Sequence, residues 1–327
     1  MIPELSDLTA TARVVSLPLA TRFRGLDRRE ALLLEGPEGW TEFSPFVEYD
    51  DDEAASWLAA ALDFGWQATP ALRRSDVPVN ATLPAVAVAE VAQVLERFGA
   101  ARTVKVKVAE RGQVLADDVA RVAEARRILG PEGRIRVDAN AGWNVDEAEH
   151  AIHALAPYDL EYVEQPCATV PELAEIRERV HYMGVPIAAD ESVRKASDPL
   201  AVARAGAADL LVIKAQPLGG IHSALRIARE AGLPVVVSSA LDTSVGISMG
   251  LHLAGALDEL EYDCGLATAA LLAADVVDAP LLPRDGLIPI VRVTPAPALL
   301  DGHSADAERT AWWLDRLART HAVLTTR

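Results

Sequence analysis

Short apolar segments that end in a charged residue recur through the middle of the chain. They are Val104–Lys107, Ile135–Asp138, Leu160–Glu164, Pro186–Asp190 and Leu211–Lys214. Their last residues are 31, 26, 26 and 24 positions apart, the spacing expected for one strand, one helix and two loops per unit. Their short, β-branched composition is typical of strands buried in a parallel sheet. The pattern therefore predicts a repeated strand–helix unit.

The pattern continues on both sides of this region. Further strands are predicted at Val77–Ala81, Val235–Ser239 and Glu261–Asp263. Helices are predicted at Ala85–Phe98, Gln113–Leu129, Val145–Leu155, Val170–Tyr182, Pro199–Ala205, from Gly219-Gly220 through Ala231, and at Ser244–Leu257. Eight strands, seven of them followed by helices, predict an α/β fold, a (β/α)7β TIM-like barrel over residues 76–279. Its active face is expected at the C-terminal ends of the strands.

A different pattern precedes the barrel. Strands at Thr11–Leu19, Ala31–Glu35 and Trp40–Val47 are followed by a helix that the acidic run Asp50–Glu53 opens and that reaches about Phe64. Residues 1–75 are therefore expected to form an α+β capping domain. An extended segment over Leu281–Val293 and a helix over Ala305–Arg319 end the chain, and residues 280–327 are expected to return to the cap.

Composition narrows the class of protein. The chain has 327 residues, half of them hydrophobic, and a formal charge of −17, which argues against binding of nucleic acid or anionic membranes. No apolar run reaches membrane-spanning length and the N-terminus lacks a signal-peptide pattern, so a cytoplasmic location is expected. Two cysteines, Cys167 and Cys264, cannot form a disulfide framework. Oligomeric state is left open.

Three carboxylates stand at the ends of successive predicted strands. Asp138, Glu164 and Asp190 should converge at the barrel mouth, where a buried charge is costly without a partner or a function. An all-oxygen set of ligands favours Mg²⁺ or Mn²⁺ over zinc. The alternative is a structural ring of ion pairs with neighbouring lysines, although burying three such carboxylates without a cation is expensive.

Lysines are rare, and their positions are informative. Only Lys105, Lys107, Lys195 and Lys214 occur, and three of them lie on predicted strands. Lysine with a lowered pKa can accept a proton, whereas arginine cannot. Because alternate strand residues share a face, Lys105 and Lys107 should both point into the mouth, and Lys214 should face Lys107 across the metal. This arrangement suits removal of a proton next to a carboxylate.

Five motifs in order carry a family resemblance. Lys-Val-Lys, Val-Asp-Ala-Asn, Val-Glu-Gln-Pro, Ala-Asp-Glu-Ser and Ile-Lys-Ala resemble the signature of the enolase superfamily, muconate-lactonising subgroup. Within it, the chain is most similar to the o-succinylbenzoate synthase family. That closer resemblance rests on Phe23-Arg24-Gly25, Glu42–Phe46 with Glu48-Tyr49, Val77–Thr82, and Arg136 two residues before Asp138.

The resemblance implies roles for these residues. Asp138, Glu164 and Asp190 would bind Mg²⁺, which Mn²⁺ could replace. Lys107 would remove the α-proton and then, as an acid, help the hydroxyl leave, while Lys214 would remain cationic and stabilise an enediolate. Lys105 would tune Lys107 and contact the substrate carboxylate, or serve only as a salt-bridge partner. Arg136 is a further candidate for substrate contact.

Other substrate contacts are expected with plain structural alternatives. Ser238, Ser239 and Thr243 would bind a succinyl carboxylate or cap a helix. Gly220 would bring a helix N-terminus to a substrate anion or permit a tight turn. Arg22 and Phe23, with Arg24, would close over the substrate or form an ordinary exposed hairpin loop.

The reaction implied is the syn dehydration of 2-succinyl-6-hydroxy-2,4-cyclohexadiene-1-carboxylate to o-succinylbenzoate, in menaquinone biosynthesis. The partner is thus a small-molecule carboxylate. Two alternatives stay open. One is an N-succinylamino acid racemase or dipeptide epimerase, which would use the same metal and both lysines as bases. The other is a non-catalytic barrel that only binds, against which the complete set of lysines and carboxylates argues.

Overall fold

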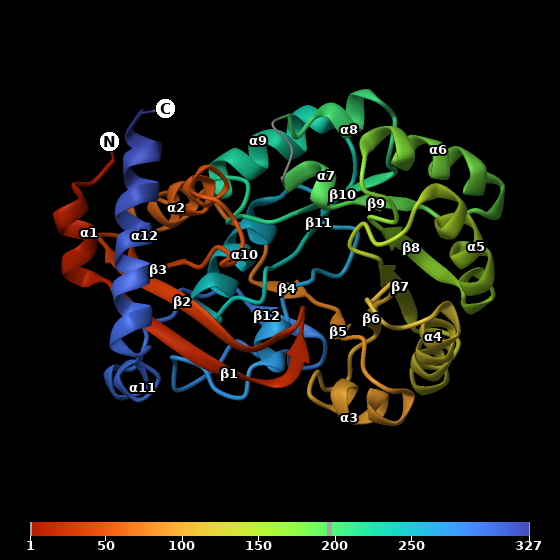
Figure 1. Ribbon diagram of the computed structural model, residues 1–327, viewed down its shortest axis with the longest axis horizontal. Coiled ribbons are helices and arrows are strands. Elements are labelled where there is room, and N and C mark those ends of the chain that lie inside the picture. The colour runs from red at the N-terminus through yellow and green to blue at the C-terminus, as the bar shows by residue number, and fades with distance from the viewer. Residues whose placement is uncertain (1, 195–197, 327) are drawn as a thin grey trace.

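A computed structural model describes residues 2–194 and 198–326 (Figure 1). The N-terminal part is an antiparallel sheet in the order β1 (Arg13–Phe23), β2 (Leu26–Gly36) and β3 (Gly39–Phe43). Helix α1 (Leu5–Thr11) precedes the sheet, and α2 (Asp51–Trp66) follows it. The Asp50 side chain accepts a hydrogen bond from the Glu53 amide at 2.8 Å, so the acidic run caps α2 as its sequence indicates.

A curved parallel sheet forms the larger part. Its order is β11 (Val235–Val237), β10 (Leu210–Ile213), β9 (Ile187–Ala189), β8 (Leu160–Glu164), β7 (Arg134–Asp138), β6 (Thr103–Lys107) and β5 (Ala81–Leu83). The elements between and after these strands are η1 (Val88–Glu90), α3 (Val91–Glu96), α4 (Leu115–Leu129), α5 (Val145–Leu155), η2 (Ala156–Tyr158), α6 (Val170–Val180), η3 (His181–Met183), α7 (Glu191–Arg194), α8 (Ala201–Arg204), α9 (Ile221–Ala231), α10 (Ser244–Ala256) and η4 (Thr268–Leu271). The barrel-type prediction is confirmed.

The eighth strand predicted at Glu261–Asp263 was wrong. The chain instead closes the barrel with isolated parallel bridges, from Cys264 to Val79 and from Gly265 to Ser238. Asp263 is held elsewhere: its carbonyl accepts from Arg136 at 2.6 Å and its carboxylate from Thr103 at 2.5 Å.

The first predicted strand is divided in two. Strand β4 (Asp76–Pro78) pairs antiparallel with β12 (Leu287–Pro289), and only β5 enters the barrel. Pro78 has no N–H for a ladder, which fits a strand that ends there. Strand β4 lies just after the boundary proposed at residue 75, and its partner β12 lies in the tail that follows residue 280. The two domain boundaries stay a prediction.

The C-terminal tail packs on the cap. Helices α11 (Pro297–Gly302) and α12 (Ala307–Thr326) end the chain, and α12 runs beside the N-terminal sheet in Figure 1. Trp313 is fully buried, packs edge to face on Phe43 and donates to Glu30 at 2.9 Å. Among the helices of the described chain, none is long and apolar enough to cross a membrane.

Candidate active site

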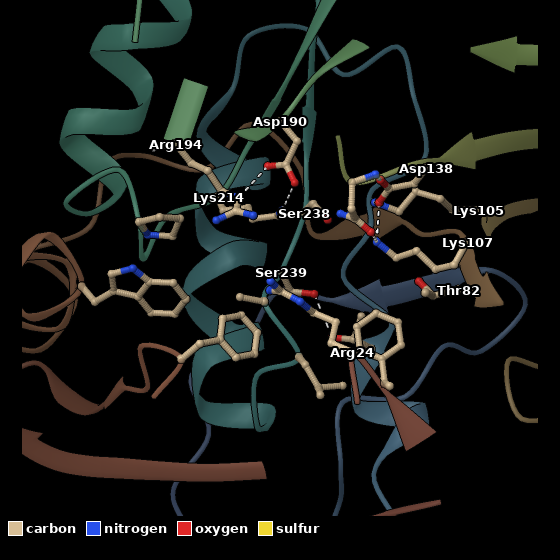
Figure 2. Close-up of a pocket in the computed structure, with 18 residues that line it drawn as sticks. Arg24, Thr82, Lys105, Lys107, Asp138, Asp190, Arg194, Lys214, Ser238 and Ser239 are labelled. Atoms are coloured by element: carbon tan, nitrogen blue, oxygen red, sulfur yellow. Dashed lines mark hydrogen bonds and ion pairs between the residues drawn. The ribbon is translucent and has the colours of Figure 1, made fainter. Parts of the chain in front are cut away.

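A pocket lies at the C-terminal ends of the barrel strands, beneath the cap (Figure 2). The cap lines it with Phe23, Arg24, Phe46 and Trp57. The barrel contributes Thr82, Lys105, Lys107, Asp138, Asn140, Asp190, Arg194, Lys214, Pro217, Ser238, Ser239, Ala240, Leu241 and Thr268. A concave site between two domains, lined by several cationic side chains, suits a small organic acid.

The three predicted carboxylates lie at neighbouring strand ends. Asp138 ends β7, Glu164 ends β8, and Asp190 follows β9 directly. Their exposed fractions are 1%, 0% and 1%. Parallel pairing places Asp138 beside Glu164 in register at this edge of the sheet.

Each carboxylate is held by a lysine. Lys105 donates to both oxygens of Glu164 at 3.0 Å and lies 3.4 Å from Asp138. Lys107 forms a short hydrogen bond to Asp138. Lys214, the residue after β10, donates to Asp190 at 2.5 Å. In Figure 2, Lys214 lies on one side of the pocket and Lys105 and Lys107 lie on the other.

The two lysines of β6 have opposite electrostatic settings. Burial lowers the pKa of Lys107, and the nearby Lys105 charge adds to the effect, although Asp138 opposes it. Burial also acts on Lys105, but the charges of Glu164 and Asp138 outweigh it and raise the pKa of Lys105 above its usual value. Lys107 is thus the better proton acceptor of the pair.

The carboxylates have the donors that a hard divalent cation requires. Burial, and then the charge of Asp138, raises the pKa of Glu164 to about 7, which indicates an excess of buried negative charge. Burial alone would also raise the pKa of Asp190, but the positive charges of Lys214 and Arg194 outweigh it and lower that pKa to about 2. Within residues 2–194 and 198–326, no group of three His, Cys, Asp or Glu side chains is gathered in metal-binding geometry. The ammonium groups are the present counterions, and the donor set itself fits Mg²⁺.

Besides Lys105, three of the residues expected to contact the substrate line the pocket: Phe23, Ser238 and Ser239. Phe23 reaches it from the tip of the β1–β2 hairpin, and its ring centroid lies 5.6 Å from the Lys107 ammonium. Ser238 and Ser239 follow β11. The Ser239 hydroxyl is already engaged, at 2.7 Å from the Gly265 carbonyl and 2.8 Å from the Thr268 hydroxyl.

Arg136 and Thr243 lie outside the pocket lining, which does not support their prediction as substrate contacts. Arg136 is fully buried one layer below Asp138, where it donates to Glu161 at 2.5 Å and to Asn80 at 3.1 Å. Thr243 caps α10, and its hydroxyl donates to Glu42 at 2.5 Å. Thr243 therefore has the structural role that was the alternative to substrate binding, that of a helix cap.

Gly220 and Arg22 also lie outside the pocket lining. Gly220 has a φ of 111°, and the α9 N-terminus behind it is occupied by Asp63, which accepts from the Ile221 amide at 2.7 Å. The Asp63 carboxylate therefore already occupies the N-terminus of α9, where a substrate anion was expected. Arg22 is exposed and its nearest carboxylate is Asp27, at 4.0 Å.

From the sequence, Arg194 was assigned no role, and Arg24 was named only with Arg22 and Phe23, as a loop that closes over the substrate or as an ordinary exposed hairpin. Arg194 is buried and lies 3.1 Å from Asp190, one helical turn away, a spacing that could have flagged it. Arg24 projects from the hairpin turn. Its positive φ of 51° can be seen only in the fold. Lys195 lies outside the described residues.

Comparison with known proteins identifies the family. The model of the enolase C-terminal domain-like family matches residues 86–297, and that of the enolase N-terminal domain-like family matches residues 14–65. The o-succinylbenzoate synthase of Mycobacterium tuberculosis (strain ATCC 25618 / H37Rv) is 53% identical over 325 residues, which cover 99% of this chain and 98% of that protein. The enzyme of the same name from Mycobacterium ulcerans is 52% identical, with the same coverage.

Solved structures agree on the fold. The muconate lactonizing enzyme of Pseudomonas putida superposes with a TM-score of 0.74 at 20% identity, covering 90% of this chain and 98% of that one. The dipeptide epimerase of Enterococcus faecalis, in complex with Mg and a dipeptide, gives 0.72 at 22% identity, covering 87% and 97%. With the full-length relatives and both domain matches, this chain belongs to the enolase superfamily and, within it, to the o-succinylbenzoate synthase family.

Proposed function

We propose that this chain catalyses the magnesium-dependent syn dehydration of 2-succinyl-6-hydroxy-2,4-cyclohexadiene-1-carboxylate to o-succinylbenzoate, a step of menaquinone biosynthesis. One observation carries the proposal: the chain is about half identical along its whole length to o-succinylbenzoate synthases. The capped pocket, lined by Asp138 and Asp190 with Lys105, Lys107 and Lys214, supports it, and Glu164 is buried beside Asp138. The small-molecule carboxylate expected from the sequence is the substrate class that such a pocket fits.

Asp138, Glu164 and Asp190 would hold the Mg²⁺ ion, and Mn²⁺, which takes the same oxygen donors, would substitute for it. When bound, the ion supplies positive charge that offsets the negative charge developing on the substrate carboxylate. The all-oxygen, fully buried donor set supports this assignment.

Lys107 acts as the base because burial lowers its pKa. As a neutral amine it takes the proton from the carbon beside the ring carboxylate. As an ammonium it returns that proton to the departing hydroxyl, which leaves as water. A syn elimination removes the proton and the hydroxyl from the same face of the ring, so one residue can carry out both transfers. Lys214 remains an ammonium, hydrogen-bonded to Asp190, and offsets charge from the opposite side.

The test is direct turnover of the cyclohexadiene substrate, followed by its ultraviolet change. Activity is expected with Mg²⁺, is lost after chelation, and returns when Mg²⁺ is added back. Each enantiomer of an N-succinylamino acid, incubated in heavy water, serves as the comparison. Racemisation without dehydration would contradict the proposed reaction, and full activity in metal-stripped protein would contradict the proposed chemistry.

A further inference from the structure

Arg24 is the pocket cation whose carboxylate partner is the most distant. Of the five cationic side chains that line the pocket in the described chain, Lys105, Lys107, Lys214 and Arg194 each contact a carboxylate at 3.0 Å or closer. The nearest carboxylate to Arg24 is that of Glu48, at 3.9 Å and largely exposed. No hydrogen bond joins the Arg24 side chain to another described residue. Its N–H donors are therefore available to a ligand.

The backbone at Arg24 is held in an unfavourable conformation. Phe23 pairs with Leu26, so Arg24 and Gly25 form a two-residue hairpin turn with φ angles of 51° and 75°. Positive φ at both positions is the geometry of a type I′ turn, whose first position normally carries Asn, Asp or Gly. An arginine there breaks the local rule. Such conflicts concentrate at functional sites, because structure alone would select another residue.

The guanidinium is aimed and supported by the cap. Its carbon lies 4.2 Å from the centroid of the Phe46 ring, and the Arg29 guanidinium carbon lies 4.5 Å from the same centroid. Arg29 is buried, and its donors are used by Ser44 and by the Leu241 carbonyl. The second cation adds positive potential around Arg24 while the ring fixes the plane of its guanidinium. Both effects favour an anion beside Arg24.

Figure 2 places Arg24 on the opposite side of the pocket from Asp138 and Asp190. The proposed substrate has two carboxylates, one at the reacting carbon and one at the end of the succinyl chain. The first belongs with the metal ligands and lysines. The second needs hydrogen-bond donors of its own, since a carboxylate that loses water without gaining a partner is costly. The Ser239 hydroxyl already bonds Gly265 and Thr268, whereas the Arg24 donors are free to bind it.

We propose that Arg24 binds the distal carboxylate of the succinyl chain through a charge-assisted hydrogen bond and thereby selects dicarboxylate substrates. This inference rests on the proposed function, and it adds the group that sets specificity at the end of the substrate far from the chemistry. Arg24 contributes binding in the ground state and the transition state alike, so it affects KM rather than kcat.

The experiment measures two ligands by calorimetry with Mg²⁺ present: o-succinylbenzoate, and its analogue whose distal carboxylate is a primary amide. The wild-type protein is expected to prefer the diacid by roughly 10- to 100-fold, the value of a charge-assisted contact. Arg24→Asn should bring this ratio close to one and raise KM about tenfold or more with kcat nearly unchanged. Arg24→Lys should retain part of the preference.

Arg24→Asn also separates binding from folding. Asn is favoured in this turn, so the variant should melt at or above the wild-type temperature while the diacid preference falls. The matched control is Arg28→Gln, which removes a charge from an exposed residue of the same hairpin that bonds Ser16. It should keep the wild-type ratio.

Two outcomes overturn the proposal, and they are distinguishable. If Arg24→Asn dehydrates the substrate and keeps the wild-type diacid preference, the Arg24 assignment fails and the proposed function stands. If the wild-type protein does not dehydrate the cyclohexadiene at all, the proposed function fails and the inference fails with it.

Discussion

Lys105 and Lys107 lie two positions apart on one strand and face the same cavity, yet they are suited to different tasks. The difference arises from their neighbours. Lys105 contacts two carboxylates, Glu164 and Asp138, whereas Lys107 contacts Asp138 and an amide oxygen, that of Asn140 at 2.7 Å. Burial would lower the pKa of Lys105, but the two carboxylates outweigh it and raise that pKa. At Lys107, burial and the positive charge of Lys105 outweigh the carboxylates and lower the pKa.

Lys107→Arg is expected to lower turnover by about three orders of magnitude or more, because an arginine stays protonated and cannot accept the α-proton. The measurement is the ultraviolet assay of dehydration at saturating substrate and Mg²⁺. Circular dichroism and the melting temperature should stay near wild type, since the ion pair with Asp138 can be retained. Wild-type turnover in this variant would mean that another residue is the base.

Site residues differed in how far the sequence could predict them. Those at strand ends were accessible, because alternation and spacing fix the direction of Lys107, Asp138 and Glu164 once the strands are known. Thr243 was not, since its partner is Glu42, 201 positions away, on the cap. Arg24 was noticed in the hairpin but gained no role of its own, because its unusual backbone angle has no local signal.

At the scale of elements, helix α9 lies between two glycines with positive φ, and only one of them is crowded. At Gly220 an added Cβ would lie 2.5 Å from the Asp63 side chain, whereas at Gly232 nothing lies within 4 Å. Gly220→Ala is expected to lower the free energy of unfolding by about 3 kcal/mol and Gly232→Ala by about 1 kcal/mol. Urea unfolding of both variants isolates the clash with Asp63. Equal losses would mean that Asp63 moves aside freely.

The contact between β3 and α10 predicts a pH dependence. Glu42 accepts hydrogen bonds from Ser44, Thr243 and the Gly246 amide, and burial, then the charge of Asp242, raises its pKa from 4.5 to about 7. The folded protein therefore holds a proton that the unfolded chain has released. This contribution to stability is complete below pH 4.5 and is lost as the pH rises through about 7.

Glu42→Gln removes the ionisation while keeping the shape of the side chain. Relative to wild type, its free energy of unfolding should increase by about 3 kcal/mol between pH 4.5 and pH 8 to 9. Melting curves of both proteins across this range provide the measurement. A stability difference that does not change with pH would show that Glu42 is ionised throughout.

Elements were predicted best where the local signal is strong. Helix α5 has the bounds predicted for it, Val145–Leu155, because Asn144 and Glu147 form a reciprocal cap at its start. Helix α7 has four residues, too few for a periodic pattern, and was missed. Strand β5 was merged with β4, since Val77–Ala81 reads as one apolar run and only the partner strands divide it.

At the scale of the whole molecule, the pocket requires parts from both ends of the chain. Arg316 of α12 is buried and donates to the carbonyls of Phe46 and Tyr49, at 3.1 and 2.6 Å. The C-terminal helix thereby holds the cap segment whose Phe46 lines the pocket. Although the chain carries a net charge of −17, five cationic side chains among the described residues line its pocket, so overall charge says little about the ligand.

In the described chain, the barrel is closed only by isolated bridges, between Val79 and Cys264 and between Ser238 and Gly265. We expect amide hydrogens in this region to exchange faster than those of the regular strands. Strands β6 and β7 pair over five positions, whereas the closing segment is joined to Val79 and Ser238 by one bridge each. Local opening should begin where the ladder is thinnest. Mass spectrometry should find faster deuterium uptake around residues 236–239 and 262–266 than around 103–107, and a bound ligand should slow it because Ser238, Ser239 and Thr268 line the pocket. Local opening of the barrel where residues 264–265 meet Val79 and Ser238 would then depend on whether a ligand occupies the pocket.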